Sequence, residues 1–279
     1  MKCFNDLPED IKQSLFSQLR TIWTHTSTAI EGNTLTLGET DFVISEGLTI
    51  SGKPLKDHRD IMGHARAVDM IFDLVKKDEF ERQDLFNLHL LVIAEQILDA
   101  YKPVGEWKNT DNSTSTVING IQGTISYSRH YETPDLMEKW LQMLNESVKI
   151  TATDDEVLDA YTRLHLAFVS IHPFFDGNGR IARLVSNIPC LKAGFPPIVI
   201  GTTSKNLYKQ AIAEYQTAHG VPTRGGELVI TGVHFDRFKS FCSQNWQPTI
   251  QLLNDARNLQ SQRILQENEY RLASLSSPP

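Results

Sequence analysis

The chain has 279 residues, of which 40% are hydrophobic and 22% are charged, a composition typical of globular proteins with a sizeable core. The formal net charge of −7 argues against a general nucleic-acid binder, because such proteins present a basic surface to phosphates. Cys3, Cys190 and Cys242 lie far apart and form no CxxC pair, which excludes a disulfide scaffold and a cysteine metal framework.

The sequence predicts a cytoplasmic protein without a membrane partner. No N-terminal segment combines a basic flank with an apolar stretch, and no apolar run approaches the length that spans a bilayer. We expect three parts: N-terminal helices over 1–75, a core over 76–215 and a C-terminal helical extension over 216–279.

Helical periodicity dominates the first hundred residues. Apolar residues recur at helical spacing in four segments: 11–30, 36–47, 57–76 and 82–97. Gly32-Asn33 ends the first segment, and Thr36 with Glu39 has the spacing of a capping box at the start of the second.

The segment 103–133 is different. It is rich in Gly, Asn, Ser and Thr and carries alternating β-branched residues. Thr116-Val117-Ile118 and Thr124-Ile125-Ser126-Tyr127 predict two short strands around a turn, which is a β-hairpin.

Helical patterns return for the remainder of the chain. They cover 134–144, 154–171, 179–193, 204–218, 233–245 and 247–273. The last of these is amphipathic, and its apolar side would contact either a second copy of the chain or the body of its own: Ile250, Leu253, Ala256, Leu259 and Ile264. The predicted fold class is mainly α with one β-hairpin.

A polar loop joins the predicted helices 154–171 and 179–193. Gly177 and Gly179 would let the backbone curl around an anion at a helix start, where N–H groups are unpaired. Arg180 and Arg183 are three residues apart and share one helix face, which favours joint binding of phosphate.

The same loop holds groups for chemistry beside the phosphates. His172 is suited to act as a base, because an unperturbed histidine side chain can take up a proton near neutral pH. Asp176 offers oxygen to a divalent metal, although it would also serve as a helix cap. These residue types predict a polyphosphate site with a base next to it.

The segment from His172 to Arg183, HPFFDGNGRIAR, resembles the signature of the Fic family, His-Pro-Phe-x-Asp/Glu-Gly-Asn-Gly-Arg-x-x-Arg, at each specified position. The resemblance extends over most of residues 10–215. It implies a Fic-type helical bundle with a β-hairpin flap over the active-site loop. Most members transfer AMP from ATP to a Ser, Thr or Tyr hydroxyl of a protein and release pyrophosphate.

The resemblance also implies roles for individual residues. His172 would deprotonate the target hydroxyl, Asp176 would bind Mg²⁺, and Phe174 would point into the core and anchor the loop. The nucleotide phosphates would be held by the remaining residues of the motif: Gly177, Asn178, Gly179, Arg180 and Arg183.

Two further elements resemble parts of the family. The hairpin edge at Val117, Ile118, Gly120 and Ile121 would pair with an extended segment of the target protein. The run from Ser27 to Asn33, STAIEGN, is similar to the family's inhibitory helix, and by this match Glu31 would pair with Arg183 and keep it from the γ-phosphate.

The resemblance leaves alternatives open. The same loop would support removal of AMP, transfer of a phosphoryl group, or nucleotide binding in a regulatory module without catalysis. The expected partners are ATP and protein substrates, and the chain itself would be one of these substrates. Relatives also suggest that the chain forms a homodimer.

Some residues receive no role at this stage. Lys108 stands where many relatives have an arginine. His58, His64, His89 and His165 are interpreted as surface or core residues, and Tyr208 as a core aromatic in the region where relatives contact adenine.

Overall fold

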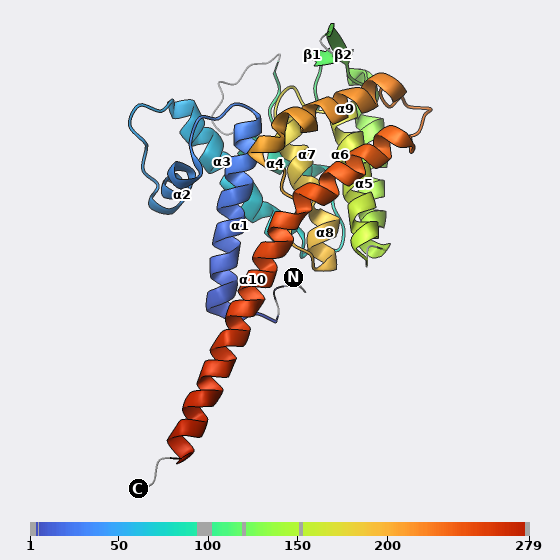
Figure 1. Ribbon diagram of the computed structural model, residues 1–279. Coiled ribbons are helices and arrows are strands. Elements are labelled where there is room, and N and C mark those ends of the chain that lie inside the picture. The colour runs from blue at the N-terminus through green and yellow to red at the C-terminus, as the bar shows by residue number, and fades with distance from the viewer. Residues whose placement is uncertain (1–3, 5, 94–101, 119–120, 151–152, 277–279) are drawn as a thin grey trace.

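The computed structural model describes residues 4, 6–93, 102–118, 121–150 and 153–276. Within these ranges the protein is a bundle of helices with a single two-stranded antiparallel sheet (Figure 1). This confirms the predicted class, mainly α with one hairpin.

The first α-helices of the described chain are α1 Glu9–Ile30, α2 Leu37–Glu46, α3 Leu55–Leu74 and α4 Arg82–Val92. The capping box at the start of α2 is confirmed, because Oγ1 of Thr36 accepts from the backbone N–H of Glu39 at 3.2 Å and Oε2 of Glu39 accepts from that of Thr36 at 2.8 Å. The predicted continuation of α4 to residue 97 lies outside the described residues.

The central helices enclose the core, and their bounds are α5 Thr133–Ile150, α6 Asp154–Ile171, α7 Asn178–Val185 and α8 Ile188–Ala193. The large side chains of Trp140, Phe168 and Phe174 are fully buried there. The main core also draws on the N-terminal and C-terminal parts through Trp23 and Trp246, so one apolar interior joins the ends of the chain to its middle.

The single helix predicted over 179–193 is wrong, since α7 and α8 are separate. Pro189 lies in the first turn of α8, where its missing N–H leaves no donor for a continuous helix. The Asn187 side chain occupies the break: it accepts from the N–H of Ile198 at 2.7 Å and donates to the carbonyl groups of Ile198 and Arg183 at 2.9 Å each.

Two α-helices follow α8 in the described chain, α9 Lys205–His219 and α10 Val233–Ser276. We predicted two helices over 233–245 and 247–273, and this is wrong because α10 runs on through Pro248. Side chains on either side of that proline bind one segment: Nε1 of Trp246 donates to the Pro196 carbonyl at 2.8 Å, and Oγ1 of Thr249 donates to the Pro197 carbonyl at 2.6 Å.

The hairpin consists of β1 Ser113–Ile118 and β2 Ile121–Ser126, paired antiparallel with Ser113 opposite Ser126 and Ile118 opposite Ile121. It stands next to α9 at the upper end of the bundle in Figure 1. We call its open end the foot of the hairpin, where Ser113 faces Ser126 and where Asn112 and Tyr127 flank the strands.

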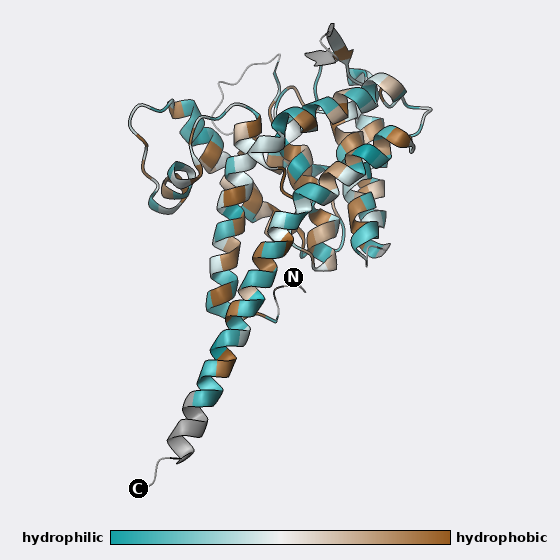
Figure 2. Ribbon diagram, viewed as in Figure 1, coloured by the Kyte–Doolittle hydropathy of each residue, from teal (hydrophilic) through white to brown (hydrophobic). Residues whose placement is uncertain are grey.

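The two terminal helices, α1 and α10, lie side by side (Figure 1). Leu253 of α10 joins a separate apolar cluster with Leu15 and Leu19 of α1. Beyond this contact α10 projects from the body, and Figure 2 shows the projecting part as mainly hydrophilic. Among the described helices, none combines the length and the apolar character that crossing a membrane requires.

Candidate active site

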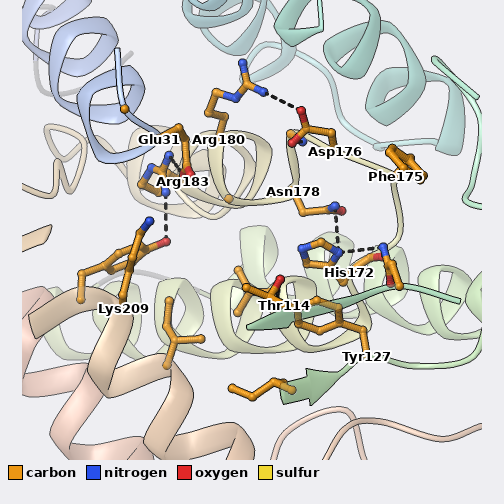
Figure 3. A pocket seen from close by; sticks show the side chains of 18 of the residues that line it. Glu31, Thr114, Tyr127, His172, Phe175, Asp176, Asn178, Arg180, Arg183 and Lys209 are labelled. Atoms are coloured by element: carbon orange, nitrogen blue, oxygen red, sulfur yellow. Dashed lines mark hydrogen bonds and ion pairs between the residues drawn. The ribbon is translucent and has the colours of Figure 1, made fainter. Parts of the chain in front are cut away.

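A cavity of about 710 Å³ opens at the start of α7. Its walls come from the end of α1, the foot of the hairpin, the loop between α6 and α7, and α9 (Figure 3). The volume lies within the range of about 300–1,000 Å³ that is usual for small-molecule sites.

Phe174 anchors the loop between α6 and α7. Its ring is fully buried and stacks on His89 with ring centroids 3.9 Å apart. The Asn178 side chain closes the loop around it, because its Oδ1 accepts from the N–H of Phe174 at 2.9 Å and its Nδ2 donates to the carbonyl at 2.8 Å. The expected anchoring role of Phe174 is therefore seen in the packing.

Gly177 allows the chain to turn from this loop into α7. Its φ of 79° is left-handed, and an added Cβ would lie 2.9 Å from Cδ1 of Ile93. Both the conformation and the space favour glycine. The turn exposes the first backbone N–H groups of α7 to the cavity, which is a favourable place for an anion.

His89 holds the loop through both of its ring nitrogens, a role that the sequence analysis missed. Its Nδ1 accepts from the N–H of Gly105 at 2.9 Å, and the other ring nitrogen, Nε2, donates to the Asp176 carbonyl at 3.2 Å. Burial lowers its pKa to about 4, so it remains neutral and can keep both bonds at physiological pH.

His172 lies at the end of α6 with φ 54° and ψ 61°, the left-handed conformation. Its Nδ1 contacts the amide nitrogens of Asn112 at 2.9 Å and Asn178 at 3.1 Å. The ring of Tyr127 is stacked on the imidazole, with centroids 3.8 Å apart and an angle of 2° between the planes. Burial, with the charge of Lys108, lowers the pKa of His172 to about 3.

Lys108 is buried beside this histidine. Its Nζ donates to Oδ1 of Asn112 at 2.8 Å, the Ser128 carbonyl at 2.7 Å and the Ile171 carbonyl at 3.1 Å. Burial lowers its pKa to about 8. Lys108 has no role assigned from the sequence, but in the structure it fastens the foot of the hairpin to the end of α6.

Arg183 is almost completely buried, and four acceptors surround its guanidinium group. Nη2 donates to Oε1 of Glu31 at 2.7 Å and to the Ser27 carbonyl at 2.9 Å, Nε donates to Oγ of Ser27 at 3.0 Å, and Nη1 donates to the Tyr208 hydroxyl at 3.2 Å. Burial alone would lower the pKa of Arg183, but Tyr208 and Glu31 raise it above its usual value.

Glu31 therefore lies where the sequence resemblance implies, against Arg183 (Figure 3). Its side chain is 37% exposed and lines the cavity. Burial would raise its pKa, yet the charge and the hydrogen bond of Arg183 outweigh burial and lower it. The carboxylate fits against Gly179, where an added Cβ would lie 2.8 Å from Oε1.

Arg180 points away from Arg183, although the two are three residues apart. Its Nη1 contacts Oδ1 of Asp60 at 3.4 Å and the Val92 carbonyl at 3.2 Å, and its Nη2 lies 3.6 Å from Oδ2 of Asp176. In this state the two arginines are thus held by different helices, not directed jointly at one anion.

Asp176 presents one carboxylate to the cavity. Its side chain is 59% exposed, and its Oδ1 accepts from the N–H of Gly177 at 2.6 Å. Across the described ranges, no cluster of three or more His, Cys, Asp or Glu side chains is arranged to hold a metal ion.

One part of the cavity lining comes from helices rather than from the loop. It contains side chains of α6 and α9, namely Val169, Tyr208, Ile212, Ala213 and Gln216, with Lys209 beside them. The sequence favours a core position for Tyr208, and in the structure it belongs both to the core and to the cavity wall. It is 3% exposed, lines the cavity, and its hydroxyl forms a hydrogen bond with Nε2 of His165 at 2.9 Å.

The hairpin contributes Thr114, Ile125 and Tyr127 to the cavity. Of the predicted docking residues, Val117 and Ile118 lie in β1 and Ile121 begins β2, whereas Gly120 lies outside the described residues. The structure thus brings the foot of the hairpin next to His172.

Residues 79–190 match the family model Fic/DOC. The loop between α6 and α7 lies inside the matched residues, so this part of the chain is similar to the Fic/DOC family. Among solved structures, a Fic-domain signaling protein of Bacteroides thetaiotaomicron is 25% identical with a TM-score of 0.76, covering 90% of this chain and 93% of the other. Fic-1 of Caenorhabditis elegans shares the fold, at 23% identity and a TM-score of 0.71, covering 92% of this chain and 69% of the other.

Curated relatives are similar over a shorter stretch. The protein adenylyltransferase Fic of Drosophila grimshawi is 29% identical over 185 residues, which are 65% of this chain and 35% of that protein. The protein adenylyltransferase fic-1 of Caenorhabditis elegans is 29% identical over 195 residues, which are 67% of this chain and 35% of that protein. The alignments thus span about a third of the length of these relatives.

Proposed function

We propose that this protein is an adenylyltransferase that transfers AMP from ATP to a Ser, Thr or Tyr hydroxyl of a protein. The observation that carries the proposal is the position of His172 in one cavity with the N-terminus of α7 and the foot of the hairpin. The similarity to proteins named adenylyltransferases supports it.

The start of α7 and the α9 wall would hold the two ends of a nucleotide. At one end, the backbone at Gly177, Asn178 and Gly179 would receive the α- and β-phosphates, because helix N–H groups and dipole favour anions there. Arg180 and Arg183 would contact the outer phosphates after leaving their present partners. At the other end, Val169 and the α9 side chains would cover the adenine.

Asp176 would hold Mg²⁺ together with the nucleotide phosphates. A single exposed carboxylate fits this ion, since Mg²⁺ usually keeps several waters and binds one or two carboxylates plus phosphate oxygens. The ion would supply charge neutralisation at the phosphates.

The hairpin would present the target. A strand of the target protein would add to the edge formed by Val117, Ile118, Gly120 and Ile121, with backbone hydrogen bonds that tolerate many sequences. A hydroxyl of that strand would then be presented to His172. The chain itself would serve as one such target.

His172 would take the proton from the hydroxyl as its oxygen attacks the α-phosphorus. A P–O bond to AMP forms, the bond from the α-phosphorus to the bridging oxygen breaks, and pyrophosphate leaves with that electron pair. The other residues position and neutralise charge, which is the main requirement of phosphate transfer.

The pair of Glu31 with Arg183 would restrain this activity. The guanidinium group cannot meet the γ-phosphate while the carboxylate holds it at 2.7 Å. A nucleotide would then bind without its productive alignment, and the protein would be autoinhibited through the end of α1.

The test is incubation of the Glu31→Gly variant with α-labelled ATP, Mg²⁺ and cell lysate, followed by mass spectrometry. We expect labelled protein with an added AMP, and no label when His172→Ala is introduced as well. An added phosphate would indicate phosphoryl transfer, and loss of AMP from a modified protein would indicate the reverse reaction. ATP binding without any modification would leave a regulatory nucleotide-binding module and contradict the proposal.

A further inference from the structure

The orientation of the Asn112 side chain is fixed by its partners. Its Oδ1 accepts from Nζ of Lys108 at 2.8 Å, and an ammonium group can only donate. Its Nδ2 must therefore be the atom that faces Nδ1 of His172 at 2.9 Å and the Phe174 carbonyl at 3.0 Å.

The Asn178 side chain is fixed in the same way. Its Oδ1 accepts from the N–H of Phe174 at 2.9 Å, which leaves Nδ2 to face the carbonyl of the same residue at 2.8 Å and Nδ1 of His172 at 3.1 Å. Two amide NH₂ groups thus converge on one ring nitrogen (Figure 3).

This convergence determines where the imidazole carries its proton. An amide nitrogen offers no lone pair, so Nδ1 of His172 has to accept, and the single proton of the neutral ring must lie on Nε2. Because the amides occupy the Nδ1 edge, Nε2 is the ring nitrogen left for the cavity that His172 lines. In this tautomer Nε2 faces the cavity as an N–H donor, and it has no free lone pair to accept a proton.

We propose that Asn112, oriented by Lys108, is a positioning residue that keeps His172 in the Nε2-protonated tautomer, and that the base becomes active only when Asn112 releases Nδ1. The second half of this inference rests on the proposed function. The tautomer does not, since it can be measured without catalysis.

The position of Asn112 indicates what would release it. It directly precedes β1, and Tyr127, whose ring covers the imidazole, directly follows β2. The N–H of Tyr127 donates to the Asn112 carbonyl at 3.2 Å, so the two residues form the foot of the hairpin. A target strand bound to the hairpin would act on the foot and, through it, on His172.

The test uses the variant Asn112→Asp. A carboxylate at this position can only accept a hydrogen bond from the ring. It therefore favours a proton on Nδ1 of His172 and leaves the lone pair on Nε2. The charge of the new carboxylate is balanced by Lys108. Lys108 and Tyr127, the titratable residues that act on His172 in the structure, are left in place in this variant. Asn145→Asp is the control, because Nδ2 of Asn145 also donates to a phenylalanine carbonyl, that of Phe80 at 3.0 Å, but outside the cavity.

The first readout is the nitrogen-15 NMR spectrum of labelled protein, with His172→Gln for assignment. In the unaltered chain we expect the unprotonated signal at Nδ1 and the protonated one at Nε2, and in Asn112→Asp the reverse. A proton on Nδ1 in the unaltered chain overturns the inference, whatever the enzyme activity. The control variant should keep the original tautomer.

The second readout is self-modification in the Glu31→Gly background at neutral pH. We expect Asn112→Asp to raise the initial rate by about tenfold, since a correctly protonated base contributes about 10²–10⁴-fold. A lower rate in protein shown by NMR to carry the switched tautomer overturns the restraining role of Asn112. Absence of any modification in the Glu31→Gly parent contradicts the proposed function instead and leaves the tautomer result standing.

Discussion

Arg183 is held by more than the glutamate with which the sequence pairs it. Ser27, four residues before Glu31 on α1, supplies two of its acceptors, and Tyr208 of α9 supplies another. Loss of Glu31 alone therefore removes the anion but leaves the guanidinium group fastened to the same helix. Under the proposed autoinhibition, activation would need a rotation of Arg183 as well as departure of the carboxylate.

The pH dependence of the Glu31–Arg183 pair follows from the lowered pKa of Glu31. A carboxyl group with a lowered pKa in the folded state stabilises the fold above its unfolded pKa of about 4.3 and loses that contribution as pH falls through the folded value. We expect the difference in melting temperature between the unaltered protein and Glu31→Gln to be constant from pH 8 to about pH 5 and to shrink below about pH 4. A difference that changes between pH 6 and 8 would contradict this assignment.

The turn at Gly177 can be tested against a matched glycine. Gly47 has nearly the same conformation, with φ 68° against 79°, but open space around its Cα. We expect Gly47→Ala to lower the free energy of unfolding by about 1 kcal/mol and Gly177→Ala by about 2–3 kcal/mol, because only the latter adds a contact with Ile93 to the left-handed strain. Denaturant titration measures both, and equal losses would show that the contact has no effect.

The residues of the site that could be predicted are those in one continuous motif. The loop from His172 to Arg183 has fixed spacing, and a helix start dictates much of its chemistry. Asn112, Lys108 and His89 contact this loop from 60 or more residues away in the chain, and no periodicity marks such partners. Only the unusual lysine at 108 gave a signal, and without the fold it had no meaning.

At the scale of elements, the sequence located the helices well and their breaks poorly. Pro189 interrupts a predicted helix, while Pro248 fails to interrupt α10. The difference lies in tertiary contacts: Asn187 holds the break at 187 to Ile198, whereas Trp246 and Thr249 hold both sides of Pro248 to residues 196–197. Local patterns do not contain those contacts, so they cannot decide between a break and a continuous helix.

The continuity of α10 predicts a gain in stability for Pro248→Ala. Proline costs about 3 kcal/mol in a helix interior relative to alanine, and its restriction of the unfolded chain returns about 0.4–1 kcal/mol. We expect an increase of about 2 kcal/mol in the free energy of unfolding by denaturant titration. Pro134→Ala is the control, since Pro134 lies in the first turn of α5 where proline is tolerated. Equal effects of the two changes would contradict the account of α10.

For the whole molecule, the contact between α1 and α10 joins the two ends of the described chain. The sequence left the choice between self-packing and a partner copy open, and the structure shows Leu253 packed against α1. The exposed apolar residues farther along, Leu259, Ile264 and Leu265, have no part in that cluster. The apolar residues have the same spacing in both parts of the helix. Only the position of α1 in the fold therefore distinguishes the buried Leu253 from the exposed residues farther along.

A pair of leucines tests this division. Leu253 is 5% exposed and Leu265 is 63% exposed on the same helix. We expect Leu253→Ala to lower the free energy of unfolding by about 2–4 kcal/mol, since it empties a buried site, and Leu265→Ala to change it by less than about 0.5 kcal/mol. Thermal or denaturant unfolding of the two variants provides the comparison, and a large loss from Leu265→Ala would show that the projecting part of α10 has a partner in solution.

Because Gly179 has no Cβ, the Glu31 carboxylate and a nucleotide phosphate would compete for the same space beside its backbone. The Glu31 carboxylate occupies space next to the backbone that we propose for phosphate, so one recess serves two anions, one free and one attached to the chain. An attached competitor is present at an effective concentration in the millimolar range or above, whatever the dilution of the protein. Added nucleotide would therefore relieve the restraint only weakly, and a change that tilts the end of α1 away from Gly179 would relieve it at any nucleotide concentration.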